Sequence, residues 1–331
     1  MKSYTYKDGV FTFEGSISVQ EEKQWCRPWR IPFDRIDLYP YLSGVAGEPS
    51  GVRISFTTNS QNAILKLHEP TEGIKLDLYS DGIFFKEQIC NNNHDVFFSG
   101  LYDNMKEIEI WLDPRYPFYL ESISVDDNAF IRKTVNTKKR WIHYGSSISH
   151  SREAAAPSKT WAGIVAMETD FHLTNIGFAA NCILEPMVGK MIRDTPADLI
   201  TLKLGINCHS GALSRRAFEP NAIGLISLIR EKHPDTPLKI ISPIYSPERE
   251  ITRKLDISLT LPEIREVLEA VVLKFQKYGD RAIDYIDGLN ILGSDGIGYL
   301  PDKLHPNAEG QYIMAKNFMK FIHGNKGGRL K

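Results

Sequence analysis

The chain has 331 residues, of which 42% are hydrophobic and 24% are charged, values typical of a soluble globular protein of one or two domains. This composition excludes a long disordered segment, a fibrous repeat and a disulfide-knotted miniprotein. With 40 Lys and Arg against 41 Asp and Glu, the formal charge is −1, which leaves no positive surplus to neutralise a nucleic-acid backbone.

The amino-terminal segment and the cysteines favour a cytoplasmic location. The first eight residues are polar and lack the apolar core of a secretion signal. No apolar run approaches the roughly 20 residues that span a bilayer. The four cysteines lie far apart, without the spacing of a metal site or a disulfide framework. We therefore expect reduced thiols, no membrane span and no nucleic-acid partner.

The first 135 residues contain short segments that alternate between apolar and polar side chains, rich in β-branched and aromatic residues. They are 9–15, 51–57, 63–67, 75–79, 95–98, 107–112 and 119–125. Because no stretch of helical period separates them, they predict an antiparallel, jelly-roll-like β-sandwich over residues 1–135. Polar residues at 126–128 and 138–140 mark its end.

From residue 136 the pattern changes to strands alternating with helices. Apolar strand segments occur at 141–144, 173–176, 199–204, 238–241 and 282–286. A helix is predicted from Pro262 to Gly279, with an apolar stripe at Ile264, Val267, Leu268, Val271 and Phe275. This alternation predicts a three-layer α/β/α domain with a five-stranded parallel sheet over 136–323, followed by a flexible tail at 324–331.

Functional groups in such sheets gather beyond the carboxyl ends of the strands. The first strand runs into Gly145-Ser146-Ser147, which can form a tight turn that exposes a hydroxyl, or only an ordinary turn. This is not the G-x-S-x-G motif of α/β-hydrolases, because Ser149 stands where the last glycine would be.

Three further strand ends carry candidate groups. Gly177 either presents its amide to a ligand or forms a plain turn, and Asn207 either caps a helix or donates its side-chain amide into the cleft. After the last strand, Asp302 precedes His305 by three residues, a spacing that can orient an imidazole toward a nucleophile. Together these residues supply the nucleophile, base, orienting carboxylate and oxyanion donors that serine acyl chemistry needs.

This order of Ser147, Gly177, Asn207 and His305 resembles the four blocks of the SGNH (GDSL-type) esterase and acylhydrolase superfamily. The resemblance covers residues ~138–323 and is most specific in Asp302-Lys303-Leu304-His305-Pro306-Asn307. Ser146 stands where the family commonly has Asp. The Gly-Ser-Ser-Ile form resembles a subgroup with an amino-terminal β-sandwich called the GxDLY domain; Asp77-Leu78-Tyr79 is present here, with Lys75 in place of its glycine.

The resemblance implies a serine esterase that cleaves a small carboxylic ester, such as an acetyl or short acyl group on a sugar or metabolite. It implies a catalytic triad of Ser147, His305 and Asp302, and an oxyanion hole formed by the Ser147 and Gly177 amides with the Asn207 side chain. No cofactor is expected, and no metal is expected because HExxH and ligand-spaced His or Cys pairs are absent.

Two alternatives to hydrolysis stay open. The same residues can serve an acyltransferase, in which a bound alcohol displaces water, or the chain can be a non-catalytic carbohydrate-binding protein. His150, His209 and Tyr245 follow strand ends and are candidates for contact with the small-molecule ester. The sequence indicates neither the acyl length nor the oligomeric state.

Overall fold

The computed structural model of the chain describes residues 1–169 and 171–322. The backbone forms two compact units. The first contains Met1–Lys138 together with Ala156–Ser158 and His172–Ile176, and the second contains the rest. The tail predicted over 324–331 lies outside the described residues.

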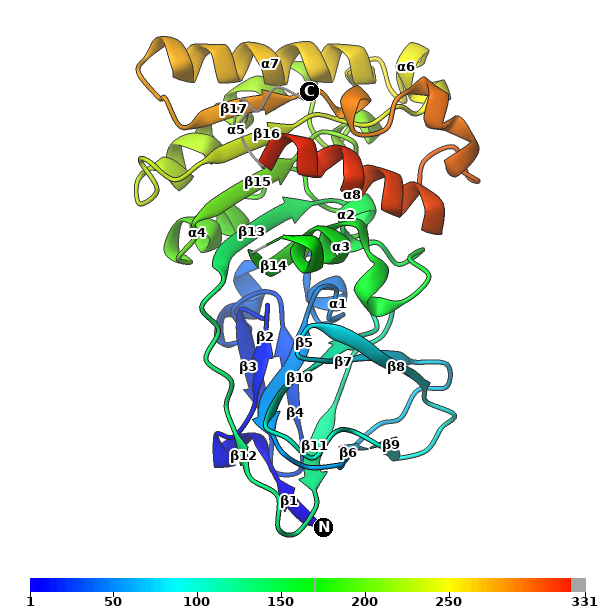
Figure 1. Cartoon of the computed structure of the whole chain (residues 1–331). Coiled ribbons are helices and arrows are strands. Elements are labelled where there is room, and N and C mark those ends of the chain that lie inside the picture. The colour runs from blue at the N-terminus through cyan, green and yellow to red at the C-terminus, as the bar shows by residue number, and fades with distance from the viewer. Residues whose placement is uncertain (170, 323–331) are drawn as a thin grey trace, which may run out of the picture. The chain divides into compact units, whose positions relative to one another are not determined.

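The first unit consists mainly of two antiparallel sheets (Figure 1). One has the order β3-β4-β11-β6-β9 with β1 paired to β11, and contains β1 (Lys2–Tyr4), β3 (Ser18–Glu21), β4 (Cys26–Trp29), β6 (Asn62–Leu67), β9 (Asp95–Ser99) and β11 (Leu120–Val125). The other has the order β12-β5-β10-β7-β8 with β2 paired to β5, and contains β2 (Thr12–Glu14), β5 (Arg53–Thr58), β7 (Lys75–Ser80), β8 (Ile83–Ile89), β10 (Lys106–Leu112) and β12 (Ile131–Arg132). Short helices η1 (Tyr6–Asp8), η2 (Phe33–Leu38) and α1 (Ser43–Ala46) complete it.

The core of this unit is built from the alternating residues of both sheets. Ile54 and Ile110 pair across β5 and β10, and both belong to one buried cluster with Leu65 of β6 and Ile123 of β11. Since strands with one apolar face must bury that face against another layer, the alternation produces a sandwich. The antiparallel β-sandwich is therefore confirmed.

The Asp77-Leu78-Tyr79 segment lies on β7 and binds Ser158 of the first unit. The buried Asp77 carboxylate accepts hydrogen bonds from the Ser158 amide at 2.9 Å and from its hydroxyl at 2.7 Å. The Tyr79 hydroxyl donates to the Ser158 oxygen at 2.9 Å. These bonds satisfy one oxygen of the buried Asp77 carboxylate, while its Oδ1 has no partner among the described residues, and they give the motif a structural role at this point of the sandwich.

The second half of the chain contains a five-stranded sheet of order β14-β13-β15-β16-β17. Its strands are β13 (Lys139–Gly145), β14 (Phe171–Gly177), β15 (Leu199–Lys203), β16 (Leu238–Ile241) and β17 (Ile283–Ile286). The pairs β13–β15, β15–β16 and β16–β17 are parallel. The predicted parallel sheet is confirmed, and each predicted strand lies within two residues of its observed bounds.

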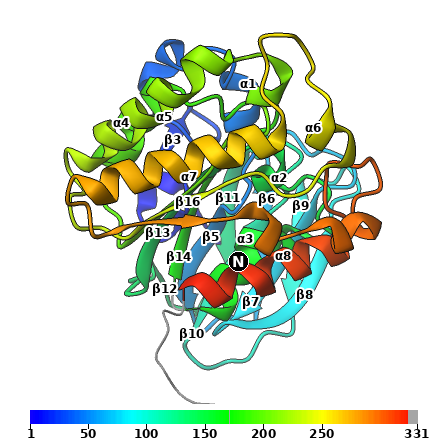
Figure 2. The ribbon, with the colours of Figure 1, turned by 90° about the horizontal axis from the view of Figure 1, so that it is seen from above.

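Helices cover both faces of this sheet. They are α2 (Ser147–His150), α3 (Trp161–Glu168), α4 (Pro186–Asp194), α5 (Arg215–Arg230), α6 (Pro247–Ile251), α7 (Leu261–Lys277) and α8 (Ala308–Ile322), with the 3₁₀ turns η3 (Pro157–Lys159), η4 (Cys208–Ser210), η5 (Gly288–Asn290) and η6 (Ser294–Tyr299). Figure 2 shows α4, α5 and α7 on one face of the sheet and α3 and α8 on the other.

The helix α7 shows how its sequence determines its bounds. Thr260 and Glu263 form a capping box at its start, with the Thr260 amide donating to Glu263 at 2.8 Å. Ile264 and Leu268 are buried, and Gly279, just after the end, adopts a φ of +99°. A left-handed residue after the last turn ends a helix, and glycine adopts that conformation at least cost.

Among the described residues, no helix combines the length and the apolar character that crossing a membrane requires. All four cysteines, Cys26, Cys90, Cys182 and Cys208, are buried free thiols. Burial raises the pKa of Cys208 to about 12, with a further contribution from the charge of Glu185. This thiol, next to Asn207, is therefore uncharged at neutral pH and a poor nucleophile.

Candidate active site

The candidate nucleophile begins a short helix directly after β13. Ser146 is extended and caps α2, its hydroxyl accepting a hydrogen bond from the Ile148 amide at 3.4 Å. Ser147 is the first residue of that helix and is half-buried. Because the first amides of a helix have no partner within it, the Ser147 N–H remains available to an anion at this point.

A chain of hydrogen bonds joins Ser147, His305 and Asp302. The Ser147 Oγ lies 2.9 Å from the His305 Nε2, and the His305 Nδ1 lies 2.6 Å from the Asp302 Oδ2. A carboxylate can only accept here, so Nδ1 carries the proton and Nε2 is left to accept from the serine hydroxyl. Ser147 and His305, which are 158 positions apart in the sequence, thus lie in an arrangement that can activate a serine.

Asp302 is held by its own loop. Its Oδ1 accepts the Leu304 amide at 2.9 Å and the His305 amide at 2.7 Å. Partial burial acts to raise the pKa of Asp302, but the hydrogen bonds from His305 and Leu304 outweigh it and lower the pKa below its usual value. Asp302 is therefore ionised at neutral pH and can stabilise an imidazolium.

Gly177 packs against the helix that carries Ser147. A Cβ atom at this position would lie 2.6 Å from the His150 amide nitrogen and 2.7 Å from the Ser149 Cβ. The buried backbone approach therefore requires a glycine here, independently of any bond its amide makes to substrate.

Ala180 lies closer to the candidate chemistry than the sequence suggests. It adopts a φ of +60°, is exposed, and lines the same cavity as Ser147 and His305. Within the described residues its amide forms no hydrogen bond. An alanine gives no sequence signal for this left-handed conformation, which is typical of glycine.

Asn207 follows β15 and borders the same cavity. Its side-chain amide donates one hydrogen bond to the Asn181 carbonyl, which fixes the orientation of the group. The amide nitrogen carries a second hydrogen that this bond does not use. Asn207 also begins η4 but forms no side-chain cap there, so its side chain is directed to the Asn181 carbonyl instead of the turn.

The cavity at Ser147 has a volume of about 340 Å³. It is lined by Ser147, Arg152, Glu153, Ala179, Ala180, Asn207, Leu304 and His305. Gly177 is not among these lining residues, whereas the predicted triad serine and histidine and Asn207 are. Arg152 and Glu153 belong to no recognisable motif, and Leu304 lies within the Asp302–Asn307 block without a role that the sequence indicates.

The three predicted substrate-lining residues lie in different surroundings. His150 is buried and its Nδ1 accepts the Ala179 amide at 3.3 Å. His209 lines a second cavity, described below, and its Nε2 donates to the Thr252 carbonyl at 2.8 Å. Tyr245 is half-buried and lines neither of these two cavities.

The buried residue His143 contacts α2, the helix that begins with Ser147. The His143 Nε2 and the Ser149 hydroxyl are 2.7 Å apart, and the His143 Nδ1 is 2.7 Å from the Thr201 hydroxyl. Burial, together with the charge of Lys203, lowers the pKa of His143 from 6.5 to about 3. His143 is therefore a neutral link between two strands and α2.

This histidine makes folding stability depend on pH. Between pH 6.5 and about 3 the unfolded chain binds a proton at His143 that the folded chain does not, so its contribution to stability falls as the pH falls below 6.5. At pH 5 the expected loss is about 2 kcal/mol. We expect urea unfolding of His143→Gln to show a flatter decline from pH 7 to pH 5; parallel profiles would contradict this protonation state.

Among residues 1–169 and 171–322, no three His, Cys, Asp or Glu side chains gather closely enough to hold a metal ion.

Comparison with known proteins places this arrangement in a family. The GDSL-like Lipase/Acylhydrolase family matches residues 138–323, more than half of the chain. The chain belongs to this GDSL-like family. The SsfX3 N-terminal domain family matches residues 11–121, so this GDSL-like protein carries an amino-terminal domain of the SsfX3 type. The resemblance to SGNH enzymes with an amino-terminal sandwich is confirmed.

Solved structures of similar architecture cover the whole length of this GDSL-like protein. A salicylyl-acyltransferase, SsfX3, from a tetracycline biosynthetic pathway is 32% identical, with a TM-score of 0.89 over 98% of each chain. A GDSL-like lipase from Bacteroides ovatus is 21% identical, with a TM-score of 0.74 over 97% of this chain and 96% of the other. A family two carbohydrate esterase from Clostridium thermocellum is 13% identical, with a TM-score of 0.70 over 95% and 98%. No curated protein matches the chain.

The comparisons refine the expected activity. The esterase expected from the sequence corresponds to the family as a whole, whereas the relative at 32% identity is an acyltransferase, the alternative kept open above. The two lower-identity structures support the fold alone.

Proposed function

We propose that this GDSL-like protein is a serine acyltransferase, which moves an acyl group from an ester to an acceptor alcohol through an acyl-enzyme on Ser147. The observation that carries the proposal is the 2.9 Å contact between the Ser147 Oγ and the His305 Nε2, backed by Asp302 at 2.6 Å. General-base activation needs an imidazole nitrogen within hydrogen-bonding distance of the serine oxygen, so this contact supports Ser147 as the nucleophile and His305 as the base.

In the first half-reaction, the Ser147 oxygen attacks the ester carbonyl while its proton passes to the His305 Nε2. The tetrahedral intermediate collapses, the bond to the alcohol oxygen breaks, and the same proton leaves with the alcohol. In the second half-reaction, His305 takes the proton of the acceptor hydroxyl, whose oxygen attacks the acyl-Ser147 ester. The proton then returns to the Ser147 oxygen, so the enzyme is regenerated.

The oxyanion of each intermediate needs hydrogen-bond donors in the cavity. The Ser147 amide and the Asn207 side chain are two candidates, and the sequence analysis adds Gly177 as a third. We propose Ala180 beside it, because this residue lines the cavity at Ser147 and its amide has no hydrogen-bond partner among the residues that the structure describes. Such donors are most effective when they are fixed in place before the reaction, as the bond from Asn207 to Asn181 fixes the amide here.

Removal of the Asn207 side-chain amide should lower kcat without destabilising the fold. For Asn207→Ala we expect kcat to fall about 10²–10³-fold, the effect of losing one such donor in a protease. Because Asn207 makes no side-chain cap on η4, the thermal midpoint should change little. Steady-state kinetics and a melting curve on the same sample measure both; unchanged kcat in the folded variant would remove Asn207 from the proposed oxyanion hole.

Transfer is favoured over hydrolysis by the acyltransferase at 32% identity. Hydrolysis is the second candidate, because the His305 side chain keeps 22% of its surface exposed, so that water can reach the base. Both reactions share the acyl-enzyme and differ only in which hydroxyl attacks it.

The partition of the acyl-enzyme separates the two candidates. The protein is incubated with p-nitrophenyl acetate and a series of alcohols, and nitrophenol, acetate and the new ester are quantified. A transferase gives new ester in proportion to the acceptor and an acceptor-dependent rate of turnover. Free acetate as the sole product, at a rate that no alcohol changes, would support an esterase, and no nitrophenol release would support a binding protein.

A further inference from the structure

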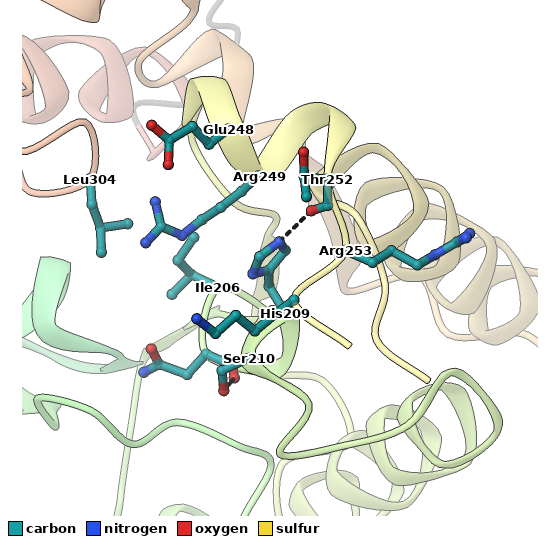
Figure 3. Close-up of a pocket in the computed structure, with 10 residues that line it drawn as sticks. Ile206, His209, Ser210, Glu248, Arg249, Thr252, Arg253 and Leu304 are labelled. Carbon is teal, nitrogen blue, oxygen red and sulfur yellow. Dashed lines mark hydrogen bonds between the residues drawn. The ribbon is translucent and has the colours of Figure 1, made fainter. Parts of the chain in front are cut away.

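A second cavity lies beside the candidate active site and is larger than the first. Its volume is about 490 Å³, and its walls come from the loop after β15, from α6 and the residues after it, and from the loop that carries His305. It is lined by Ile206, Asn207, His209, Ser210, Glu248, Arg249, Thr252, Arg253, Lys254 and Leu304 (Figure 3).

The two cavities meet at residues of the proposed chemistry. Both are lined by Asn207, the candidate oxyanion donor, and by Leu304, the neighbour of His305. A substrate whose ester carbonyl lies at Ser147 can therefore extend past Asn207 into the second cavity. An ester carbonyl carries the acyl chain on one side and the alcohol oxygen on the other. One of these two parts of the substrate remains near Ser147, and the other can occupy the second cavity.

The lining of the second cavity is strongly cationic. It contains Arg249, Arg253 and Lys254, against a single carboxylate, Glu248, which pairs with Lys303 at 2.8 Å. Lys254 and Arg249 form no ion pair with any carboxylate in the part of the chain that the structure describes. Arg253 does pair with Glu263, but that carboxylate also binds Arg215 at 2.5 Å. Glu248 also interacts electrostatically with Arg249, so one carboxylate serves several cations and the wall carries a surplus of positive charge.

Arg249 is the best placed of these cations. Its Nη1 donates to the Ser246 hydroxyl at 3.0 Å, and that hydroxyl donates to the Lys303 carbonyl at 2.8 Å. Figure 3 shows the guanidinium extending from α6 toward Leu304, on the side of the shared wall. The side chain is half-buried and anchored through one nitrogen, so the rest of its planar fork is available to an anion.

We propose that the second cavity binds an anionic group of the substrate, a carboxylate or a phosphate, through Arg249, with Lys254 and Arg253 adding to the positive potential. The proposal rests on the acyl chemistry at Ser147 proposed above and adds the substrate class. The anion belongs either to the acyl group or to the alcohol of the ester, since either can reach past Asn207. Charge-assisted bonds of this kind give both affinity and orientation.

Matched pairs of esters test the proposal. For the acyl side, the mono-p-nitrophenyl ester of adipic acid is compared with its neutral methyl ester. For the alcohol side, meta-acetoxybenzoate is compared with meta-acetoxybenzamide. The measured quantity is the ratio of kcat/KM for the anionic ester to that for its neutral partner, because acylation by Ser147 determines kcat/KM in every case.

We expect at least one pair to favour the anionic ester about tenfold, and Arg249→Gln to lower that ratio about tenfold, as the loss of one charge-assisted bond implies. Arg249→Lys should restore part of the preference. A displaced His305 loop would slow both esters of a pair equally and leave the ratio unchanged, so the ratio reports the ion pair itself. The matched control is Arg281→Gln, an exposed arginine before the amino end of β17, at the opposite edge of the sheet.

The outcomes separate this inference from the proposed function. Phenol release that depends on Ser147, but with equal kcat/KM within both pairs or a ratio that Arg249→Gln does not change, overturns the anion site and leaves acyl transfer intact. Absence of Ser147-dependent release from all four esters overturns the proposed function itself. Preference in the first pair assigns the anion to the acyl group, and preference in the second assigns it to the alcohol.

Discussion

Replacement of Ser147 by alanine should reduce the release of nitrophenol from p-nitrophenyl acetate by about 10³-fold or more, to the rate that binding and oxyanion donors alone support. The reason is that no other hydroxyl in the described chain lies within hydrogen-bonding distance of the His305 Nε2. Initial rates of nitrophenol release, corrected for the uncatalysed reaction, measure the effect. Circular dichroism verifies the fold.

The adjacent serine is the matched control for this experiment. Ser146 is fully buried and its oxygen accepts the Ile148 amide, so Ser146→Ala removes a helix cap without removing the group that His305 contacts. We expect it to cost about 0.5–2 kcal/mol of stability and far less activity than Ser147→Ala. A Ser147→Ala variant with unchanged turnover would eliminate Ser147 as the nucleophile.

The second large effect concerns Asp302, the carboxylate proposed to orient His305. We expect Asp302→Asn to lower kcat about 10²–10⁴-fold with little change in KM, since an amide cannot stabilise the imidazolium and permits the wrong tautomer. Asp302 accepts three hydrogen bonds, from the Leu304 amide, the His305 amide and the His305 ring. Asparagine can keep the two backbone bonds, so the loop should remain in place.

A carboxylate on the neighbouring η6 helix serves as the control for Asp302. Asp295 is exposed and does not contact His305, so Asp295→Asn makes the same chemical change and should leave kcat within about twofold, as surface substitutions usually do. If both variants lose activity alike, a general electrostatic effect is at work and not orientation of the imidazole. If neither does, Asp302 has no role in catalysis.

The sandwich could be predicted because apolar core residues recur at every second position of several strands, as Ile54 and Phe56 do in β5 and Ile108 and Ile110 do in β10. Strands of another kind were missed. Four of the seven residues of β8 (Ile83–Ile89) are exposed, so the apolar residues of this strand do not follow an alternation of buried and exposed positions. The strand β4 (Cys26–Trp29) contains a proline, which is unusual within a strand. Period-two patterns detect strands with one buried face and fail where exposure or turn chemistry determines the pattern.

Ser147, His305 and Asp302 could be proposed from the sequence because their chemistry is specific to side chains, and the structure brings these three side chains within hydrogen-bonding distance. The backbone donor proposed at Ala180 could not. Any residue supplies an N–H, so only conformation distinguishes Ala180, and its φ of +60° gives no sequence signal in alanine. Gly177 does have a signal, but the structure shows a packing reason for that glycine against Ser149 and His150. A glycine at a strand end can therefore reflect either close packing of the backbone or a catalytic role of its amide.

The cationic cavity could not be predicted for a different reason. Arg249 lies on the short helix α6, whose sequence reads as an ordinary charged surface segment, and nothing in it specifies the neighbourhood of Asn207 or Leu304. Those contacts depend on how the loops after β15, β16 and β17 converge beyond the sheet. Sequence patterns describe elements and their faces, but not the meeting of three loops.

The most direct test of the account is covalent labelling of the resting enzyme. The protein is treated with a p-nitrophenyl alkylphosphonate, whose phosphorus captures an activated serine, and the digest is analysed by mass spectrometry. We expect one equivalent of phosphonate on the peptide that contains Ser147, and greatly slowed labelling in His305→Ala. Modification at another residue, or equal labelling of a Ser147→Ala variant, would contradict it.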